Sequence, residues 1–207
     1  MRMHKRKHLA ERVGVLENTL MFRPENLVIN EPVILEVGCG KGGFICAHAE
    51  KNPTQSYVAS EMIENVLILA AEKAQEMNIQ NLRFVAGNFL KTAEHMPDGC
   101  CKIIYLNFSD PWPKKGHAKR RLTHKCKLDI YKRILKTGGE LRLKTDNDAL
   151  FEFSLEQFAE CGWETLWQTT DLHASEYATD NIMTEYERAF SEKGKNINAA
   201  VFINKAE

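Results

Sequence analysis

The chain alternates short apolar runs with longer stretches in which apolar residues recur at helical spacing. Short runs typical of strands lie at 33–37, 57–60, 82–86, 103–106, 140–144, 163–170 and 199–204. Helical spacing is found at 43–51, 61–77 and 122–135, from after residue 147 to about 161, and at 184–193. Strands that alternate with helices in this way predict an α/β fold with a doubly wound, mostly parallel, seven-stranded sheet.

Length and composition favour one domain without membrane segments. At 207 residues the chain can bury roughly 70% of its unfolded surface in a single core. No apolar run approaches the ~18 residues of a membrane span, and no apolar segment follows the basic N-terminus as in a signal peptide. We therefore expect a single domain over 1–207 in the cytoplasm, with 1–30 as a short basic N-terminal segment.

The cysteines and histidines indicate neither disulfides nor a metal site. The six cysteines include no C-x-x-C pair, and in a chain without an export signal they are typical of reduced thiols. The seven histidines show no metal-ligand spacing. We therefore expect no bound metal; both a monomer and a homodimer are compatible with the sequence.

The charges are unevenly distributed although the formal net charge is zero. Residues 1–12 hold five Lys/Arg and one acid, and residues 114–127 hold seven Lys/Arg and no acid. Residues 146–192 hold twelve acids and a single cation, Arg188. Segregated charge lets one face bind phosphates while the whole molecule stays neutral, so nucleic acid remains a candidate partner.

A glycine-rich turn follows the first predicted strand. Gly38, Gly40 and Gly43 have the spacing G-x-G-x-x-G between a strand and a helix, and Glu61 lies about twenty residues further on. This pattern resembles the dinucleotide fingerprint. A purely structural glycine turn is the alternative.

The polar residues at the strand ends favour a methyl donor over a nicotinamide. Glu36 lies two residues before Gly38, where a dinucleotide would place its pyrophosphate, and a carboxylate repels phosphate. S-adenosylmethionine has no phosphate, and its ammonium and sulfonium are cations. Glu61 can accept hydrogen bonds from ribose hydroxyls, and Asn88 can bind the adenine edge. With Asp110 at the end of a fourth strand, these residues predict an S-adenosylmethionine site.

The stretch YLNFSDPWPKKGHAKRRL, residues 105–122, joins an acid to a basic run. Pro111 and Pro113 fix φ and lack backbone donors, so we expect that this segment neither extends the sheet nor starts a helix. Asp110 is then held at the carboxyl end of a strand, where open α/β sheets bind ligands. An acid beside phosphate-binding cations predicts an enzyme that acts on nucleic acid; a solvated basic loop is the alternative.

Four segments, LEVGCGKGGF, YLNFSDPWPKK with HAKRRL, LKTDN and TEYERAF, together resemble the bacterial tRNA (guanine-N7-)-methyltransferase family over residues 33–190. The resemblance implies the class I (Rossmann-like) methyltransferase fold, S-adenosylmethionine as cofactor, tRNA as partner, and 7-methylguanosine in the tRNA variable loop as product. It also implies three sets of site residues. The cofactor set is Glu36, Gly38, Gly40, Glu61, Asn88 and Asp110, with Asp110 also catalytic. The guanine set is Lys114, Asp146, Thr184, Glu185, Tyr186 and Glu187. The RNA set is Gly116, His117, Ala118, Lys119, Arg120 and Arg121.

Other interpretations of these residues stay open from the sequence. Gly116 stands where this family often has arginine, which removes one phosphate contact. The loop Asp110-Pro111-Trp112 is similar to that of enzymes that methylate the exocyclic amine of adenine. A non-catalytic RNA-binding protein with the same fold is a second alternative.

Several candidate site residues also have possible structural roles. Asp110 could cap the following turn, and Trp112 could be a core aromatic residue. Asp146 and Asn147 could form the N-cap of the next helix. Thr184 with Glu187 has the spacing of a capping box.

Overall fold

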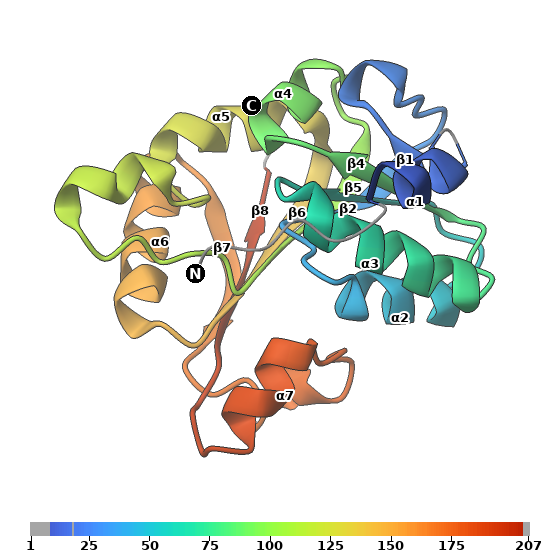
Figure 1. Cartoon of the computed structure of the whole chain (residues 1–207). Helices are drawn as coiled ribbons and strands as arrows, with labels where there is room; N and C mark the ends of the chain where they lie inside the picture. The colour runs from blue at the N-terminus through green and yellow to red at the C-terminus, as the bar shows by residue number, and fades with distance from the viewer. Residues whose placement is uncertain (1–8, 18, 205–207) are drawn as a thin grey trace. The chain divides into compact units, whose positions relative to one another are not determined.

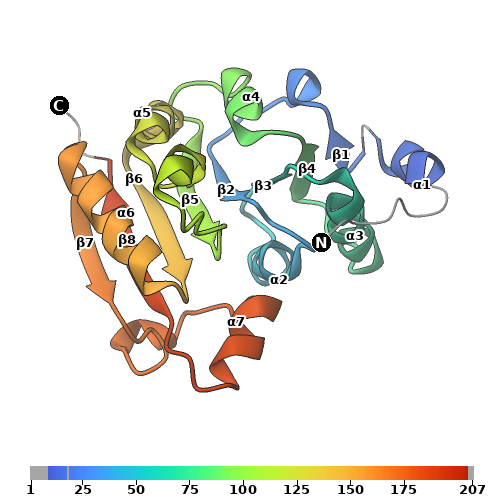
Figure 2. The same ribbon diagram turned by 60° about the vertical axis from the view of Figure 1, so that its left-hand side comes forward.

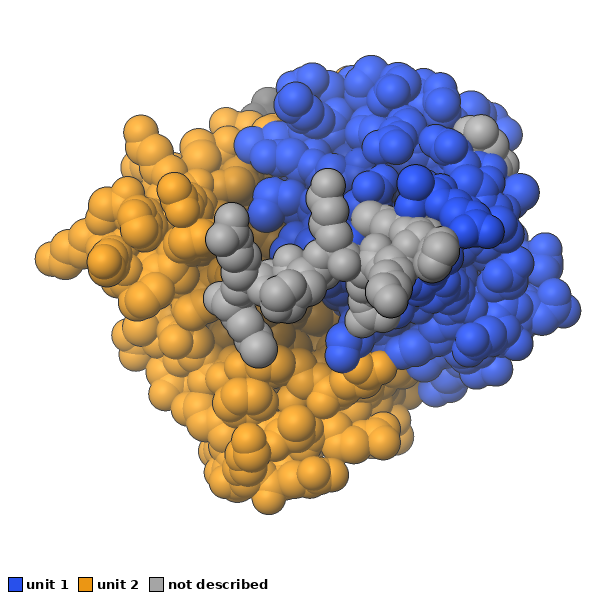
Figure 3. Space-filling view, in the orientation of Figure 1, with its two compact units in different colours: residues 1–96 blue, residues 97–207 orange. Residues whose placement is uncertain are grey.

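The alternation of strands and helices predicted from the sequence is confirmed in the computed structural model (Figure 1). The structure describes residues 9–17 and 19–204; the basic cluster between Arg2 and Lys7 lies outside them. The chain divides into Met1–Met96, called unit 1, and Pro97–Glu207, called unit 2 (Figure 3). The single domain over 1–207 stays a prediction, which this division does not test.

Unit 1 contains four parallel strands and their connecting helices. Its elements are α1 (Leu9–Leu16), β1 (Met21–Phe22), η1 (Pro24–Asn26), β2 (Val33–Val37), α2 (Gly43–Lys51), β3 (Tyr57–Glu61), α3 (Glu64–Glu76), β4 (Leu82–Ala86) and α4 (Phe89–Glu94). The strands pair in the order β1-β4-β3-β2. All five residues of β2 are buried, as expected for a β-branched run in a parallel sheet covered on both faces. Helices α2 and α3 cover one face and α4 the other (Figure 2).

Unit 2 contains one parallel and two antiparallel pairings. Its elements are β5 (Cys101–Asn107), η2 (Lys115–Arg120), α5 (Lys125–Ile134), β6 (Leu135–Thr145), α6 (Asp148–Glu160), β7 (Glu164–Thr169), η3 (Glu176–Ala178), α7 (Glu185–Ser191) and β8 (Asn198–Ile203). The strand order is β5-β6-β8-β7, with β5 and β6 parallel. The aromatic rings of Phe158 and Phe202 stack at 3.8 Å in the core between α6 and β8. Helix α7 lies beyond the carboxyl end of β6 (Figure 2).

The described residues form eight strands, so the predicted number of seven is wrong, although the mostly parallel α/β class is confirmed. The extra strand is β1, whose two residues, Met21 and Phe22, pair with Phe84 and Val85. Two residues carry no alternation that a sequence pattern could detect. None of the helices in the described part of the chain is both long and apolar enough to cross a bilayer.

The predicted start of the helix at 61–77 is wrong by three residues. Glu61 is still a strand residue, in register with Ala86, and its carboxylate Oε1 accepts a hydrogen bond from the Ile63 backbone N–H at 2.9 Å. The helix α3 therefore begins only at Glu64.

The helix predicted at 122–135 is shorter in the structure. It begins at Lys125, after His124 caps it by accepting from the Cys126 N–H at 3.2 Å, and it ends at Ile134. Strand β6 starts at the next residue and contains both glycines, where its register with β5 is irregular. Gly138 has φ +70°, so the glycines accommodate a strand irregularity instead of ending a helix.

Several short elements had no prediction because tertiary contacts stabilise them. An isolated helix of the length of α1 is marginal in water. Here the Arg12 guanidinium binds both carboxylate oxygens of Glu72 in α3, at 2.6 and 2.5 Å. The expectation that residues 105–122 start no helix is wrong at its end, because the 3-10 helix η2 begins at Lys115, beyond both prolines.

We expect Gly42→Ala to destabilise unit 1 strongly. Gly42 has φ +74°, and an added Cβ would lie 2.6 Å from the Ala70 Cβ. The left-handed conformation costs about 1–2 kcal/mol and the overpacking about 1–3 kcal/mol more. Gly194 has the same φ, and an added Cβ would have nothing within 4 Å, so Gly194→Ala should lower the stability only by the cost of the left-handed conformation. Equal losses for the two variants in urea unfolding would contradict this packing role.

Candidate active site

The glycine-rich turn after β2 adopts a conformation that only glycine adopts easily. Gly38, Gly40 and Gly42 have φ of +80°, +56° and +74°. The turn is fixed to the end of β3, because the N–H groups of Gly38 and Cys39 donate to the Ser60 carbonyl at 2.8 and 3.1 Å. Gly42 also allows close packing against α3, because an added Cβ would lie 2.6 Å from the Ala70 Cβ, and Gly43 begins α2.

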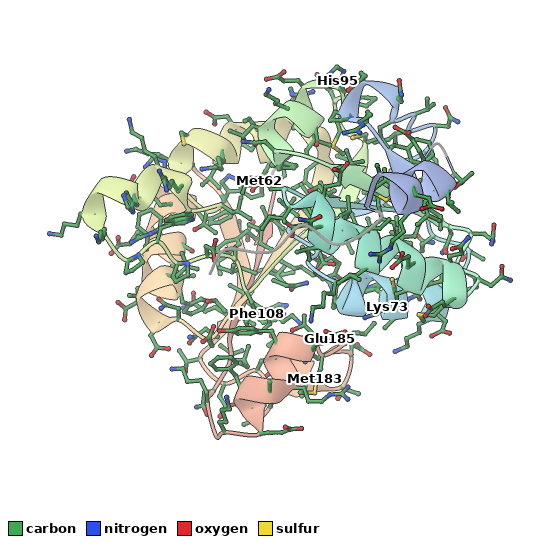
Figure 4. All side chains as sticks on the ribbon, in the orientation of Figure 1. Met62, Lys73, His95, Phe108, Met183 and Glu185 are labelled. Atoms are coloured by element: carbon green, nitrogen blue, oxygen red, sulfur yellow. The ribbon has the colours of Figure 1, made fainter. Side chains whose placement is uncertain are left out.

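Glu61 connects this turn to the segment after β3. One carboxylate oxygen accepts from the Gly40 N–H at 3.1 Å and the other accepts from the Ile63 N–H at 2.9 Å. The side chain is half-buried, so further lone pairs can accept hydrogen bonds from a ligand. Met62, directly after Glu61, is 68% exposed and adds an apolar surface at the end of β3 (Figure 4).

The turn lies in a negative electrostatic field. Glu36 is buried within β2. Burial, and then the charges of Glu36 and Glu61, raise the pKa of the Cys39 thiol well above its usual value. Burial disfavours any charge, but the two carboxylates disfavour a phosphate and favour a cation beside the turn.

Asn88 has a structural role that the sequence did not reveal. It caps α4, because its side-chain oxygen accepts from the Leu90 N–H at 2.9 Å. The side chain is exposed, so its amide nitrogen can still donate to a ligand at the end of β4. The six residues of α4 gave no periodic pattern, but Asn before an apolar residue is a typical start signal.

In unit 2, the loop after β5 carries two aromatic residues in left-handed conformation. Phe108 has φ +51° and Trp112 has φ +41°. The Phe108 N–H donates to the Lys144 carbonyl at 2.8 Å, so the chain leaves the sheet only after residue 108. Asp110 follows and is exposed, and its role at the cofactor stays a prediction.

The predicted RNA residues form the 3-10 helix η2 and its C-cap. Gly116, His117, Ala118, Lys119 and Arg120 lie within η2, and Lys114 and Arg121 are its caps. Lys114, Lys119 and Arg120 are exposed. The Arg120 guanidinium lies over the Trp112 ring at 4.7 Å, and the His117 ring meets the edge of Trp112. Trp112 is therefore a partly buried platform for η2, not a core residue.

Asp146 and Tyr186 are brought together across unit 2. The Tyr186 hydroxyl donates to Asp146 Oδ2 at 3.4 Å. Burial, and then the Asp146 charge, raise the pKa of Tyr186. The Tyr186 ring stacks on Phe190 at 4.2 Å and lies 5.1 Å from the Phe108 ring. Phe108 lies beside α7 (Figure 4). Asp146 and Asn147 are both predicted as candidates for the N-cap of α6. The structure uses Asn147, so the Asp146 carboxylate is not needed for the cap and can accept from a ligand.

The segment Thr184–Glu187 divides between the surface and the interior. Glu185 and Tyr186 are exposed. Thr184 and Glu187 form the capping box of α7, as predicted, with the Glu187 N–H donating to the Thr184 hydroxyl at 2.8 Å. For Thr184 and Glu187, contact with the substrate stays a prediction.

Glu187 is the centre of a buried polar network that the sequence did not predict. It is fully buried, and the Lys144 ammonium donates to its Oε2 at 2.7 Å. The side chains of His173 and Asn181 bind Oε1 at 2.8 and 2.6 Å. Burial raises the pKa of Glu187, but the charge of Lys144 and the three hydrogen bonds outweigh it, so the pKa lies below its usual value. A lysine on an apolar strand, as in LRLKT, was the available signal.

No metal site emerges from the residues that the structure describes. Among them, no group of three or more His, Cys, Asp and Glu side chains could hold a metal ion.

The chain is similar in sequence and in fold to methyltransferases. Residues 30–200 match the family model described as a putative methyltransferase. The tRNA (guanine-N(7)-)-methyltransferase of Brevibacillus brevis is 44% identical over 91% of this chain and 90% of its own. That of Listeria innocua is 49% identical over 80% and 77%. A SAM-dependent methyltransferase from Aquifex aeolicus shares the fold with a TM-score of 0.58, at 13% identity over 85% of this chain and 84% of its own.

We expect Glu187→Gln to destabilise unit 2 by about 3 kcal/mol near neutral pH, because it leaves the Lys144 ammonium buried without its counter-charge. Urea unfolding measures this loss. Glu160→Gln is the control, since Glu160 pairs with Lys125 at 3.4 Å between half-exposed side chains and should cost less than about 1 kcal/mol.

The same variant should show a pH dependence of defined sign. The pKa of Glu187 is lower in the folded protein than the value of about 4.3 in the unfolded chain. The ionised Glu187 therefore stabilises the fold above about pH 4.3, and this stabilisation is lost as the pH falls through the folded pKa. The difference between wild type and Glu187→Gln should therefore be full above about pH 5 and shrink in acid. A difference that grows in acid would contradict the ion pair.

Proposed function

The chain belongs to the tRNA (guanine-N(7)-)-methyltransferase family, and we propose that it transfers the methyl group of S-adenosylmethionine to N7 of a guanine in the tRNA variable loop. The observation that carries this proposal is the similarity to curated enzymes of this activity over most of both chains. The residues of each unit support the assignment of individual roles.

The residues around the glycine-rich turn fit the charge of the cofactor. S-adenosylmethionine supplies, when bound, a methyl group activated by a sulfonium. Burial is the main cause of the raised pKa of Cys39, and the negative charges of Glu36 and Glu61 add to it. These two carboxylates suit a cationic ligand and repel the pyrophosphate of a dinucleotide. The same observation argues against a nicotinamide oxidoreductase.

Glu61 and Asn88 are suited to hold the nucleoside part of the cofactor. The Gly40 and Ile63 N–H groups fix the Glu61 carboxylate before a ligand arrives, so its remaining lone pairs point in defined directions for ribose hydroxyls. The exposed Met62 offers an apolar contact for a purine, and the amide of Asn88 can donate to a purine nitrogen.

Guanine N7 needs orientation more than acid–base chemistry. N7 carries an in-plane lone pair and no proton, so no strong general base is required, and alignment of the reacting atoms provides much of the rate. In unit 2, the exposed Tyr186 ring can stack on a base, and the Asp146 carboxylate can accept from the N1 and N2 protons of guanine. We therefore propose that Tyr186 and Asp146 bind the guanine base.

Positive charge develops on the purine during transfer, and the chain has carboxylates to stabilise it. We assign this role to the exposed Asp110 and to Asp146. Lys144 lies near the end of β6, two residues before Asp146, but its charge is neutralised by Glu187 at 2.7 Å. The network therefore removes a cation that would oppose the reaction.

We expect Asp110→Ala to lower turnover at least about 100-fold, because it removes a charge that stabilises the transition state. Labelled methyl transfer to bulk tRNA, followed by digestion and mass spectrometry, gives both the rate and the product. The wild type should yield 7-methylguanosine; N6-methyladenosine would instead support the exocyclic-amine alternative.

Asp110 is exposed, so the variant should keep the melting temperature of the wild type. A melting temperature that collapses with the activity would assign Asp110 a structural role and contradict our proposal.

Glu61→Ala should weaken S-adenosylmethionine binding by about 1.5–3 kcal/mol for each ribose hydrogen bond lost, measured by calorimetry. Glu64→Ala is the matched control, since Glu64 begins α3 and pairs with Arg23 at 3.6 Å on the surface. Wild-type cofactor affinity in Glu61→Ala would remove Glu61 from the site.

A further inference from the structure

Arg121 binds the loop that follows Asp110. Its Nε donates to the Pro111 carbonyl at 2.9 Å, and its Nη2 donates to the Trp112 carbonyl at 3.2 Å. The guanidinium also lies over the Phe153 ring of α6 at 4.3 Å. The planar fork of arginine is thus occupied by two consecutive carbonyls, the geometry for which arginine is better suited than lysine.

This loop cannot hold its own conformation through backbone hydrogen bonds. Pro111 and Pro113 have no N–H, so two of the three residues after Asp110 lack a donor. Between them Trp112 has φ +41°, a conformation that residues with a side chain rarely adopt. Such backbone persists only where surrounding contacts determine it, and Arg121 supplies two of them.

Arg121 is itself fixed by a buried lysine on α5. The Lys127 ammonium donates to the Arg121 carbonyl at 2.8 Å and to the Lys119 carbonyl at 2.5 Å. Lys127 is 6% exposed, and burial lowers the pKa of its ammonium. The loop after Asp110 is therefore connected through Arg121 to a rigid helix, and neither Lys127 nor the fork of Arg121 is directed to a phosphate.

The two residues that precede Arg121 in η2 have more exposed side chains. Lys119 and Arg120 are exposed, and the Arg120 guanidinium lies over the Trp112 ring. We propose that Arg121 is a positioning residue for Asp110: it holds the Pro111–Trp112 turn so that the carboxylate stays in its reactive place, and it is not a phosphate contact. This proposal rests on the proposed function, in which Asp110 acts in the methyl transfer.

The test is methyl transfer to tRNA with Arg121→Ala and Arg121→Lys. Misplacement of a reacting group by about 1 Å can cost about 100-fold, so kcat at saturating tRNA should fall to about that extent in both variants. The salt dependence of tRNA binding should stay close to wild type. Lys119→Ala should show the other pattern, a raised KM for tRNA and a salt slope lower by about one.

Arg121→Lys separates charge from geometry. Lysine keeps the positive charge but has no fork, so a positioning role predicts low kcat and a phosphate role predicts recovery. Arg133→Ala controls for the loss of an arginine, because Arg133 pairs with the exposed Asp98 at 2.7 Å and should leave kcat unchanged.

Chemical rescue keeps the test decisive if Arg121→Ala is poorly folded. Guanidinium chloride at tens of millimolar should raise the kcat of Arg121→Ala several-fold, and sodium chloride at the same ionic strength should not. Wild-type kcat in Arg121→Ala with a salt slope lower by about one would overturn the proposal.

A double-mutant cycle distinguishes this proposal from the proposed function. If Arg121 acts through Asp110, Arg121→Ala should cost less than about threefold in the Asp110→Ala background. Multiplicative effects would overturn the positioning role while leaving the function intact. Wild-type turnover in Asp110→Ala alone would instead refute the role of Asp110, on which both depend.

Discussion

The loops that follow β2 and β5 both contain residues in left-handed conformation, and the two units stabilise this conformation by different means. After β2 the three positive φ values belong to Gly38, Gly40 and Gly42, which have no Cβ to collide. After β5 they belong to Phe108 and Trp112, whose conformation is opposed by their own side chains. The first turn is therefore determined locally, whereas the second depends on contacts from distant parts of unit 2.

The cations that look alike in the sequence have different uses in the fold. The sequence is balanced at 28 basic and 28 acidic residues, and its basic run between 114 and 127 looks uniform. Yet Lys127 binds two carbonyls, and Arg121 binds two others. Lys144 neutralises Glu187 at the end of β6. Under our proposal for Arg121, counting cations overestimates the phosphate contacts, because donors that already bind the protein's own carbonyls are not directed to RNA.

The acids are differentiated in the same way. Glu187 is buried and satisfied by three side chains, so it stabilises α7 against β6. The Glu61 carboxylate accepts from two backbone N–H groups and is partly exposed to solvent. Asp110 is exposed on a loop that other residues fix. For a reaction that needs alignment more than proton transfer, these differences in burial and in partners distinguish the roles that we propose for the carboxylates.

The sequence alone determined the α/β class, seven of the eight strands, the glycine turn and the family, because these depend on short-range periodicity and on local motifs. The capping box of Thr184 and Glu187 followed from spacing for the same reason. Only the tertiary structure decided that β6 begins at Leu135, that Glu187 binds Lys144 across 43 positions, and that Arg121 binds the loop after Asp110. These outcomes rest on side chains that meet only after folding, and no pattern within a window of a few residues contains them.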